Sequence, residues 1–404
     1  MRFAALIAGV ALATSVAEGG EVGRFRPATP EYVVLHVPAS ASNDPIALLE
    51  QRRARAPENE QVAADLARLY LARARAEREP RYFARAEALV RPWVSQAGAR
   101  TATLLVQADI LQNRHDFSGA VGLLDRAIAL DPRDASARLM RASVKMVGGR
   151  AAEARADCAG VLASGESTTG TICLAQVLGA TGGLDRARTL LKTLASREGT
   201  HPEGTDASAA TAQPAAGASS MDASVHAWEL WLLADFSDRA NDARSAEAEL
   251  RAALEAAPRN EGIRSALSDL LLSRGAYRDA LAIVDLPAPS IGLLARRARA
   301  QQLLRDSGLA DTRSQIQDLV MLASRRGDPP HLREEALMAL DVDHDAGRAL
   351  DLAKANFDTQ RETIDIRLLV RAATTAGDGT TLRSIAKWIR ETGYEDRQLA
   401  GAGT

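Results

Sequence analysis

Two tryptophans and two aspartates lie close together in one short stretch of this chain. Trp228 and Trp231 are three residues apart, and Asp235 and Asp238 follow one turn later if the stretch is helical. Aromatic rings and well-placed charges contribute most of the energy at binding interfaces. The group therefore favours a binding surface. The alternative is that both tryptophans pack as core residues against a neighbouring helix or against the low-complexity segment before them.

The motifs that would indicate catalysis are missing. The chain has no HExxH, GxSxG, GKS/T or CxxC pattern, and no GxGxxG that follows a strand. The six histidines are scattered along the sequence: His36, His115, His201, His226, His331 and His344. We therefore expect a protein that is not an enzyme, with no catalytic residue and no cofactor.

One acidic stretch resembles the first half of a calcium loop. Asp341, Asp343 and Asp345 alternate before Gly347, and alternating carboxylates can converge on a hard cation. However, the glycine comes one place late, and no glutamate stands where the bidentate ligand should be. Aspartates that cap helices at a turn explain the stretch better, so no metal site is predicted.

The only two cysteines, Cys158 and Cys173, lie on either side of a turn near Gly165. Two antiparallel helices could bring them face to face. A disulfide closing a loop of this size would contribute about 3 kcal/mol in the chain-entropy model. The alternative is two small residues buried in the core. We favour the bridge, which an oxidising compartment would permit.

A repeated pair of helices is expected to position all of these residues. Residues 101–132 read TATLLVQADILQNRHDFSGAVGLLDRAIALDP, which is two short amphipathic helices joined by a polar turn and closed by Pro132. A spacing of about 34 residues is the signature of a helical repeat. The same pattern returns at four later positions: Ala135, Thr168, Ala227 and Glu261.

Small residues recur where paired helices should cross closely. On the first helices these are Ala67, Ala108, Ala142, Ala175 and Ala234, and on the second helices Ala86, Ala120, Ala154, Ala187, Ala246 and Ala280. Gly149, Gly182 and Gly275 occupy one equivalent place in the turn between the helices, where glycine adopts a positive φ without steric cost.

The pattern resembles the tetratricopeptide repeat (TPR), with a small residue in its first helix, small and large residues in its second, and a closing proline. Phe117 and Tyr277 match the aromatic residue that often opens the second helix. The resemblance covers most of residues 60–290 and, more weakly, 291–395. It implies an all-α, right-handed superhelical solenoid of about seven to nine antiparallel helix pairs.

The resemblance also implies which residues bind a partner, because the first helices of TPR repeats line the concave face of the solenoid. The second, fifth, ninth, twelfth and thirteenth positions of a repeat point into that groove. The residues at these positions include Arg239, Ser265 and Ser273. Those that we expect to bind the partner are Asp109, Gln112, Asn113, Trp228, Trp231, Asp235, Asp238 and Asp269.

The N-terminus is typical of a secretory signal peptide. One positive charge at Arg2 precedes the apolar run 4–13, and small residues follow at Ser15 and Ala17. The run is shorter than the roughly 20 residues that span a bilayer, and no later segment is apolar enough. We expect cleavage near Ala17, a periplasmic or secreted protein, and no stable membrane insertion.

These signals divide the chain into six parts: a signal peptide (1–17), an extended lead-in (18–43), N-terminal TPR-like repeats (44–197), a disordered low-complexity insertion (198–222), further repeats (223–290) and degenerate C-terminal hairpins (291–397). The insertion could be a hinge or a passive loop between packed neighbours, and we favour the loop.

The charge balance argues against nucleic acid as the partner. The net charge is −2 with 25% charged residues, so the chain has no strong positive field. We expect a scaffold that binds an unidentified peptide or partner protein in its concave groove and assists the assembly of an envelope complex. The alternative is a periplasmic protein that binds a small molecule or a cell-wall glycan. The sequence does not indicate the oligomeric state.

Overall fold

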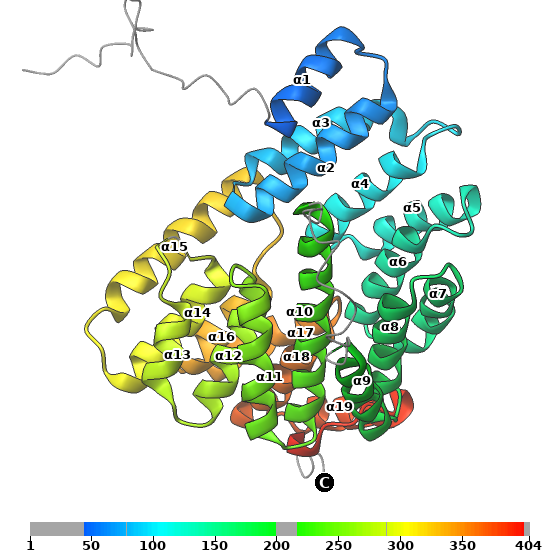
Figure 1. Ribbon diagram of the computed structural model, residues 1–404. Coiled ribbons are helices and arrows are strands. Elements are labelled where there is room, and N and C mark those ends of the chain that lie inside the picture. The colour runs from blue at the N-terminus through cyan, green and yellow to red at the C-terminus, as the bar shows by residue number, and fades with distance from the viewer. Residues whose placement is uncertain (1–43, 78, 199–215, 288, 400–404) are drawn as a thin grey trace, which may run out of the picture.

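The protein consists of α-helices throughout the part that the structure describes (Figure 1). The computed structural model describes residues 44–77, 79–198, 216–287 and 289–399, which contain nineteen α-helices, one short 3₁₀ helix and no strand. The predicted fold class, a right-handed superhelical solenoid of antiparallel helix pairs, is confirmed. The predicted signal peptide and lead-in lie outside the described residues. No helix within these ranges is long and apolar enough to cross a membrane.

The first half of the chain is a single leading helix followed by four antiparallel pairs. The leading helix is α1 (Pro45–Arg55), where Asp44 Oδ1 accepts a hydrogen bond from Ile46 N and caps the helix. The pairs are α2 (Glu60–Glu77) with α3 (Arg81–Val94), α4 (Thr101–Asn113) with α5 (Phe117–Leu130), α6 (Ala135–Val147) with α7 (Ala151–Ala163), and α8 (Ser167–Ala180) with α9 (Leu184–Glu198).

The second half adds five more pairs and ends in a short 3₁₀ helix. The pairs are α10 (Ala216–Arg239) with α11 (Ala243–Ala256), α12 (Glu261–Ser273) with α13 (Tyr277–Val284), α14 (Ile291–Leu304) with α15 (Leu309–Arg326), α16 (Leu332–Asp341) with α17 (Ala346–Phe357), and α18 (Thr363–Ala376) with α19 (Gly379–Thr392). The 3₁₀ helix is η1 (Arg397–Leu399).

Alanines make the close crossings between helices, as the sequence predicted. All eleven alanines assigned to crossings are buried to 1% exposure or less. Larger side chains such as Leu104, Leu124, Leu191 and Leu271 fill the spaces between the helices and are equally buried. Because an alanine leaves room for the facing backbone, each helix pair packs tightly and stacks on the next one.

The turns inside the pairs share one backbone conformation. Gly149, Gly182 and Gly275 have φ of 73°, 84° and 79°, which confirms the predicted turn position. His115 and Asn241 take the equivalent place in two other pairs, with φ of 60° and 62°. These two residues accept a left-handed conformation that glycine adopts more easily.

The predicted disordered insertion (198–222) is too long at both ends. Glu198 is the last residue of α9, and α10 already begins at Ala216. Residues 216–222 are rich in alanine and serine and form the first turns of α10, whose later residues are packed in the core. Extending an existing helix by a few residues costs little free energy. Residues 199–215 lie outside the described residues. Since α9 and α10 pack against each other directly, the loop alternative explains the insertion better than a hinge.

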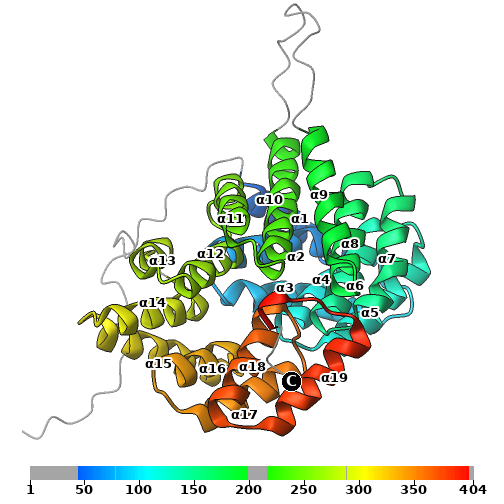
Figure 2. The same cartoon turned by 90° about the horizontal axis from the view of Figure 1, so that it is seen from below.

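The superhelix closes on itself, which the sequence did not indicate. Helices α18 and α19 return beside the middle of the array, and the helices form a ring in the view of Figure 2. The backbone N–H of Arg361, before α18, donates to the carbonyl of Val147 at the end of α6 over 2.8 Å. Gly393 lies against the turn at Gly182 between α8 and α9. The concave groove therefore becomes a central cavity that is partly open to solvent.

Candidate functional site

A cavity of about 1090 Å³ lies at the centre of the ring. Every first helix from α4 to α18 contributes to its wall, as the repeat pattern predicted, and α19 and the residues after it close one side. Because each first helix presents one face inward, residues far apart in the sequence meet around one space.

Trp228 and Trp231 act both as wall and as core. Both side chains are half-buried and line the cavity. Trp228 also packs against the buried cores formed by α6 to α8 and by α8 to α10, and Trp231 packs against the core of α10 to α13. The ring of Trp231 lies directly on Gly262, where an added Cβ would come within 2.7 Å of its Cη2 atom. The two alternatives considered for these tryptophans therefore apply together.

The three predicted aspartates of the second half line the cavity, and each is paired with an arginine. Asp235 Oδ2 lies 3.2 Å from Arg239 Nη1. Asp238 accepts from Arg367 of α18, and Asp269 Oδ2 accepts from Arg296 Nη2 over 2.6 Å. These carboxylates are therefore held in place rather than left free in solvent.

The predicted residues of the Thr101 repeat are less closely grouped. Gln112 lines the cavity. Asp109 is paired with Arg75 of α2, Asn113 is exposed at the end of α4, and neither belongs to the cavity wall. The structure thus brings together Gln112 with the tryptophans and aspartates of α10 and α12, and leaves Asp109 and Asn113 outside.

Comparison with known proteins finds no family model that matches the sequence and no curated protein that matches it. Similar solved structures include the human IFIT1 dimer with PPP-AAAA, at 13% identity, with 88% of this chain and 78% of that chain covered and a TM-score of 0.47. A tetratricopeptide repeat protein from Parabacteroides merdae is 14% identical, with 67% and 98% covered and a TM-score of 0.37. The Cut9–Hcn1 tetramer of APC/C is 13% identical, with 81% and 52% covered and a TM-score of 0.41.

The fold is a TPR-like solenoid. This statement rests on the stacked helix pairs, the buried alanines and the glycine turns described above. At these identities the similar structures describe the arrangement of helices, and what they bind is a property of those proteins.

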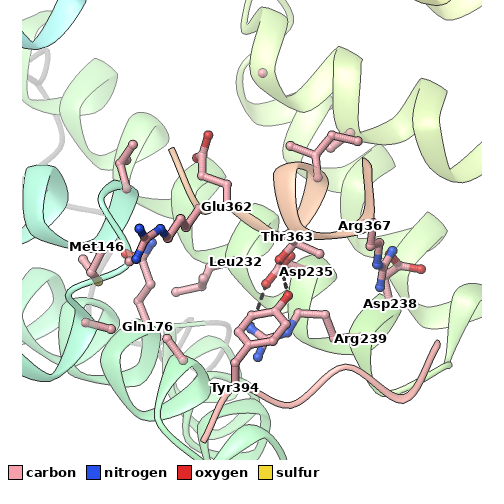
Figure 3. A pocket seen from close by; sticks show the side chains of 18 of the residues that line it. Met146, Gln176, Leu232, Asp235, Asp238, Arg239, Glu362, Thr363, Arg367 and Tyr394 are labelled. Carbon is pink, nitrogen blue, oxygen red and sulfur yellow. Dashed lines mark hydrogen bonds and ion pairs between the residues drawn. The ribbon is translucent and has the colours of Figure 1, made fainter. Parts of the chain in front are cut away.

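The TPR-like solenoid contains three site residues that sequence reasoning missed: Arg367, Tyr394 and Asp396. They lie beside Arg239, which the repeat pattern does place in the groove, as the thirteenth residue of the Ala227 repeat. The Arg239 side chain is only 3% exposed, and its Nη2 donates to the carbonyl of Gly179 over 2.6 Å. Figure 3 shows Arg239 between Asp235 and Tyr394, with Arg367 facing Asp238. No repeat position marked the three missed residues, because Arg367 and Tyr394 meet residues of α10 that are far from them in the sequence.

Ion pairs keep the buried arginines of this wall charged. Burial alone would lower the pKa of Arg367, but its hydrogen bonds and ion pairs with Asp396 and Asp238 raise that pKa above its ordinary value. The pKa of Arg239 is also raised against the effect of burial, through its ion pair and hydrogen bond with Asp235. Burial raises the pKa of the Tyr394 hydroxyl, so this side chain remains a neutral donor.

The acidic stretch 341–347 caps a helix, as predicted. Asp345 Oδ1 accepts from Arg348 N over 3.0 Å and caps α17. Asp341 pairs with Arg299 and Arg371, and Asp343 pairs with Arg313. Within the described ranges, no three His, Cys, Asp or Glu side chains are grouped as metal ligands would be.

Cys158 of α7 and Cys173 of α8 are joined by a disulfide, with their Cα atoms 5.3 Å apart. Both side chains are fully buried between the two helices. The bridge joins two consecutive repeats. Its cysteines belong to a buried cluster against which Trp228 packs.

Proposed function

We propose that this protein is a non-enzymatic scaffold that binds an extended peptide or a partner protein in its central cavity. The observation that carries the proposal is the wall itself, where Trp228 and Trp231 stand beside aspartates fixed by arginines. A hydrophobic anchor next to oriented charges is the arrangement found at binding hot spots. Because these charged side chains are already held in place, little side-chain entropy is lost on binding.

The charge of the wall favours a peptide over a nucleic acid. The wall contains eight arginines and seven acidic residues. The arginines are Arg150, Arg239, Arg296, Arg299, Arg333, Arg361, Arg367 and Arg371, and the acidic residues are Glu153, Asp235, Asp238, Asp269, Glu334, Glu362 and Glu391. A nucleic-acid site would carry a clear positive excess. Neutral groups such as Gln112, Ser143 and Gln176 also line the cavity and suit the hydrogen-bonding groups of a peptide backbone.

We further propose that the protein is exported and works in the assembly of an envelope complex. The signal-peptide pattern of residues 1–17 and the disulfide between Cys158 and Cys173 support this address. Cell fractionation together with the intact mass of the mature protein tests it. A mature chain that retains residues 1–17 in the cytoplasm would contradict it.

A second candidate is a small molecule or a cell-wall glycan as ligand. The size of the cavity favours it, since its volume of about 1090 Å³ lies just above the roughly 300–1,000 Å³ of ligand pockets. Tryptophan side chains also offer flat apolar faces to sugar rings.

Site-directed photo-crosslinking separates these candidates. A photoreactive amino acid replaces Gln176, which lines the cavity, or Glu255, an exposed residue of α11 that serves as the control. We expect position 176, but not 255, to capture a protein in cells, and the double variant Trp228→Ala/Asp235→Ala to lose the capture with its helical circular dichroism intact. Equal capture at both positions would contradict the proposal. A bound small ligand in native mass spectra, without capture, would favour the second candidate.

A further inference from the structure

Residues 393–399, here called the C-terminal segment, pack against the turn between α8 and α9 and against the C-terminal end of α10. They leave α19 at Gly393, whose φ is 72°, and they form part of the cavity wall through Tyr394 and Gln398. A glycine at this point allows the chain to change direction without steric strain.

One aromatic side chain anchors the C-terminal segment. Tyr394 is 7% exposed, and the guanidinium of Arg239 lies 4.3 Å from its ring centre. Its hydroxyl donates to Thr363 Oγ1 over 3.0 Å, and Figure 3 shows this contact beside the pair of Asp235 and Arg239.

The two residues after Tyr394 are acidic, and Arg239 and Arg367 bind them in different ways, through the backbone of Glu395 and the side chain of Asp396. The Glu395 carbonyl accepts from Arg239 Nε over 2.9 Å. The Asp396 side chain, fully buried, accepts from Arg367 Nε over 2.7 Å and from Nη2 over 3.1 Å. This bidentate pair is the strongest kind of carboxylate recognition by arginine.

The remaining contacts of the C-terminal segment are polar and partly exposed. Gln398 Nε2 donates to the carbonyl of Asp238 over 2.7 Å and to its Oδ1 over 2.8 Å. Arg397 pairs with Asp185 over 2.6 Å, with both side chains at least half exposed. Apart from the ring of Tyr394 and the partly buried Leu399, the segment is thus held by side-chain and main-chain polar contacts, as a bound peptide is.

We propose that the C-terminal segment is a releasable internal ligand of the solenoid. It occupies a surface, formed by Arg239, Arg367 and Asp238, that recognises an extended peptide with an aromatic residue followed two places later by a carboxylate. A partner protein with such a segment displaces it and opens the cavity. This inference rests on the proposed function and names the chemical class of the partner.

Because the C-terminal segment is tethered, we expect a free peptide to compete poorly with it. A tethered ligand has an effective concentration in the millimolar range. A peptide supplied in trans must therefore be present in large excess, unless the internal contacts are weakened first. Asp396→Asn weakens the contact with Arg367 with almost no change in side-chain volume. Arg367 keeps its ion pair with Asp238.

The test uses a fluorescent synthetic peptide, GYEDRQL, which copies residues 393–399, and the full-length protein. We expect Asp396→Asn to bind it about tenfold more tightly than the unaltered chain, because the tethered competitor is weakened. Lys387→Gln, at an exposed position of α19, is the matched control and should bind like the unaltered chain. A peptide with Asn in place of both acidic residues should bind at least tenfold more weakly, and adding Arg367→Gln to Asp396→Asn should abolish binding.

Equal binding of GYEDRQL to all variants, or none to Asp396→Asn, would overturn the proposal. If Asp396→Asn fails to fold, hydrogen exchange of the unaltered chain gives the answer. Millimolar peptide should then speed exchange at the amides of residues 394–399, and unchanged exchange would overturn the proposal. Photo-crosslinking from position 176 does not depend on this peptide. If that position captures a protein but GYEDRQL does not bind, the proposed function still holds, and the C-terminal segment is a permanent part of the cavity wall.

Discussion

The guanidinium of Arg239, at the end of α10, lies 4.3 Å from the ring centre of Tyr394, in the segment after α19. Both side chains are buried, so this contact joins the middle of the solenoid to its C-terminal end. Both side chains line the cavity, and their contact is one of those that close the ring.

Tyr394 can be tested by two substitutions that remove different parts of it. Tyr394→Phe keeps the ring over Arg239 and loses the hydrogen bond to Thr363, so it should cost about 1 kcal/mol of unfolding free energy. Tyr394→Ala also removes the ring from a buried site and should cost about 3 kcal/mol. Urea unfolding followed by circular dichroism measures both. Equal costs would show that the ring contributes nothing.

Asp157 of α7 should be one of the most sensitive positions in the chain. Its fully buried carboxylate accepts from Lys145 over 2.9 Å and from Arg141. Asp157→Ala removes the buried carboxylate that both cations share. It leaves Lys145 without this partner and Arg141 with the exposed Asp125 alone, so it should cost about 3–5 kcal/mol. Asp125→Ala is the matched control, because Asp125 also pairs with Arg141 but is 56% exposed, and it should cost less than about 1 kcal/mol. Similar midpoints in urea for the two variants would contradict this assignment.

The repeat architecture could be predicted from the sequence because its signals are local. An alanine at a crossing such as Ala108, or a glycine in a turn such as Gly149, is required by the geometry of one helix pair. Those requirements recur every repeat and can be counted. The hairpins after residue 290 were predicted on the same grounds, although their match to the TPR pattern is weak.

Closure of the ring could not be predicted because it depends on the sum of many small rotations between repeats. Arg367 and Asp238 meet although 129 residues separate them, and nothing in either repeat marks the other as a partner. The same limit applies to the wall, since Gln112 lines the cavity while Asn113, the next residue, does not. Position within a repeat indicates the inward face, but the curvature decides which repeats share the cavity.

Gly262→Ala should disturb the cavity wall at Trp231. The added Cβ would lie 2.7 Å from Trp231 Cη2, so the ring must move. Gly122→Ala, in α5, is the matched control, because nothing lies within 4 Å of its added Cβ. Alanine is favoured over glycine inside a helix by about 1 kcal/mol, so Gly122→Ala should be stabilised. Gly262→Ala should lose that gain and shift the tryptophan emission, and identical spectra would contradict the contact.

Asp242 should make the stability depend on pH in the acid range. A hydrogen bond from Arg188 and the cap on Ser245 N lower its pKa from 3.8 to about 2. A carboxyl whose pKa is lower in the folded state stabilises the protein above pH 4, and this contribution is lost as the pH falls from about 4 to about 2. Because the side chain is 38% exposed, solvent screening limits the contribution to less than about 1 kcal/mol.

Asp242→Asn retains an oxygen that can cap α11 and removes the charge. Its midpoint of thermal unfolding should therefore fall less than that of the unaltered protein between pH 5 and pH 2.5. The same fall in both proteins would assign the acid sensitivity to other carboxylates.

The disulfide between Cys158 and Cys173 should stabilise the protein by restricting its unfolded chain. The bridge closes a loop of 15 residues, for which the chain-entropy model gives about 3 kcal/mol. Alkylation of the unfolded, unreduced protein should add no mass, and a reductant should lower the midpoint of thermal unfolding. The control is Cys158→Ala/Cys173→Ala, whose midpoint should not respond to the reductant. Two alkylated thiols in protein recovered from the periplasm would mean that the cysteines serve only as small core residues, and the argument for an oxidising compartment would lose one of its two supports.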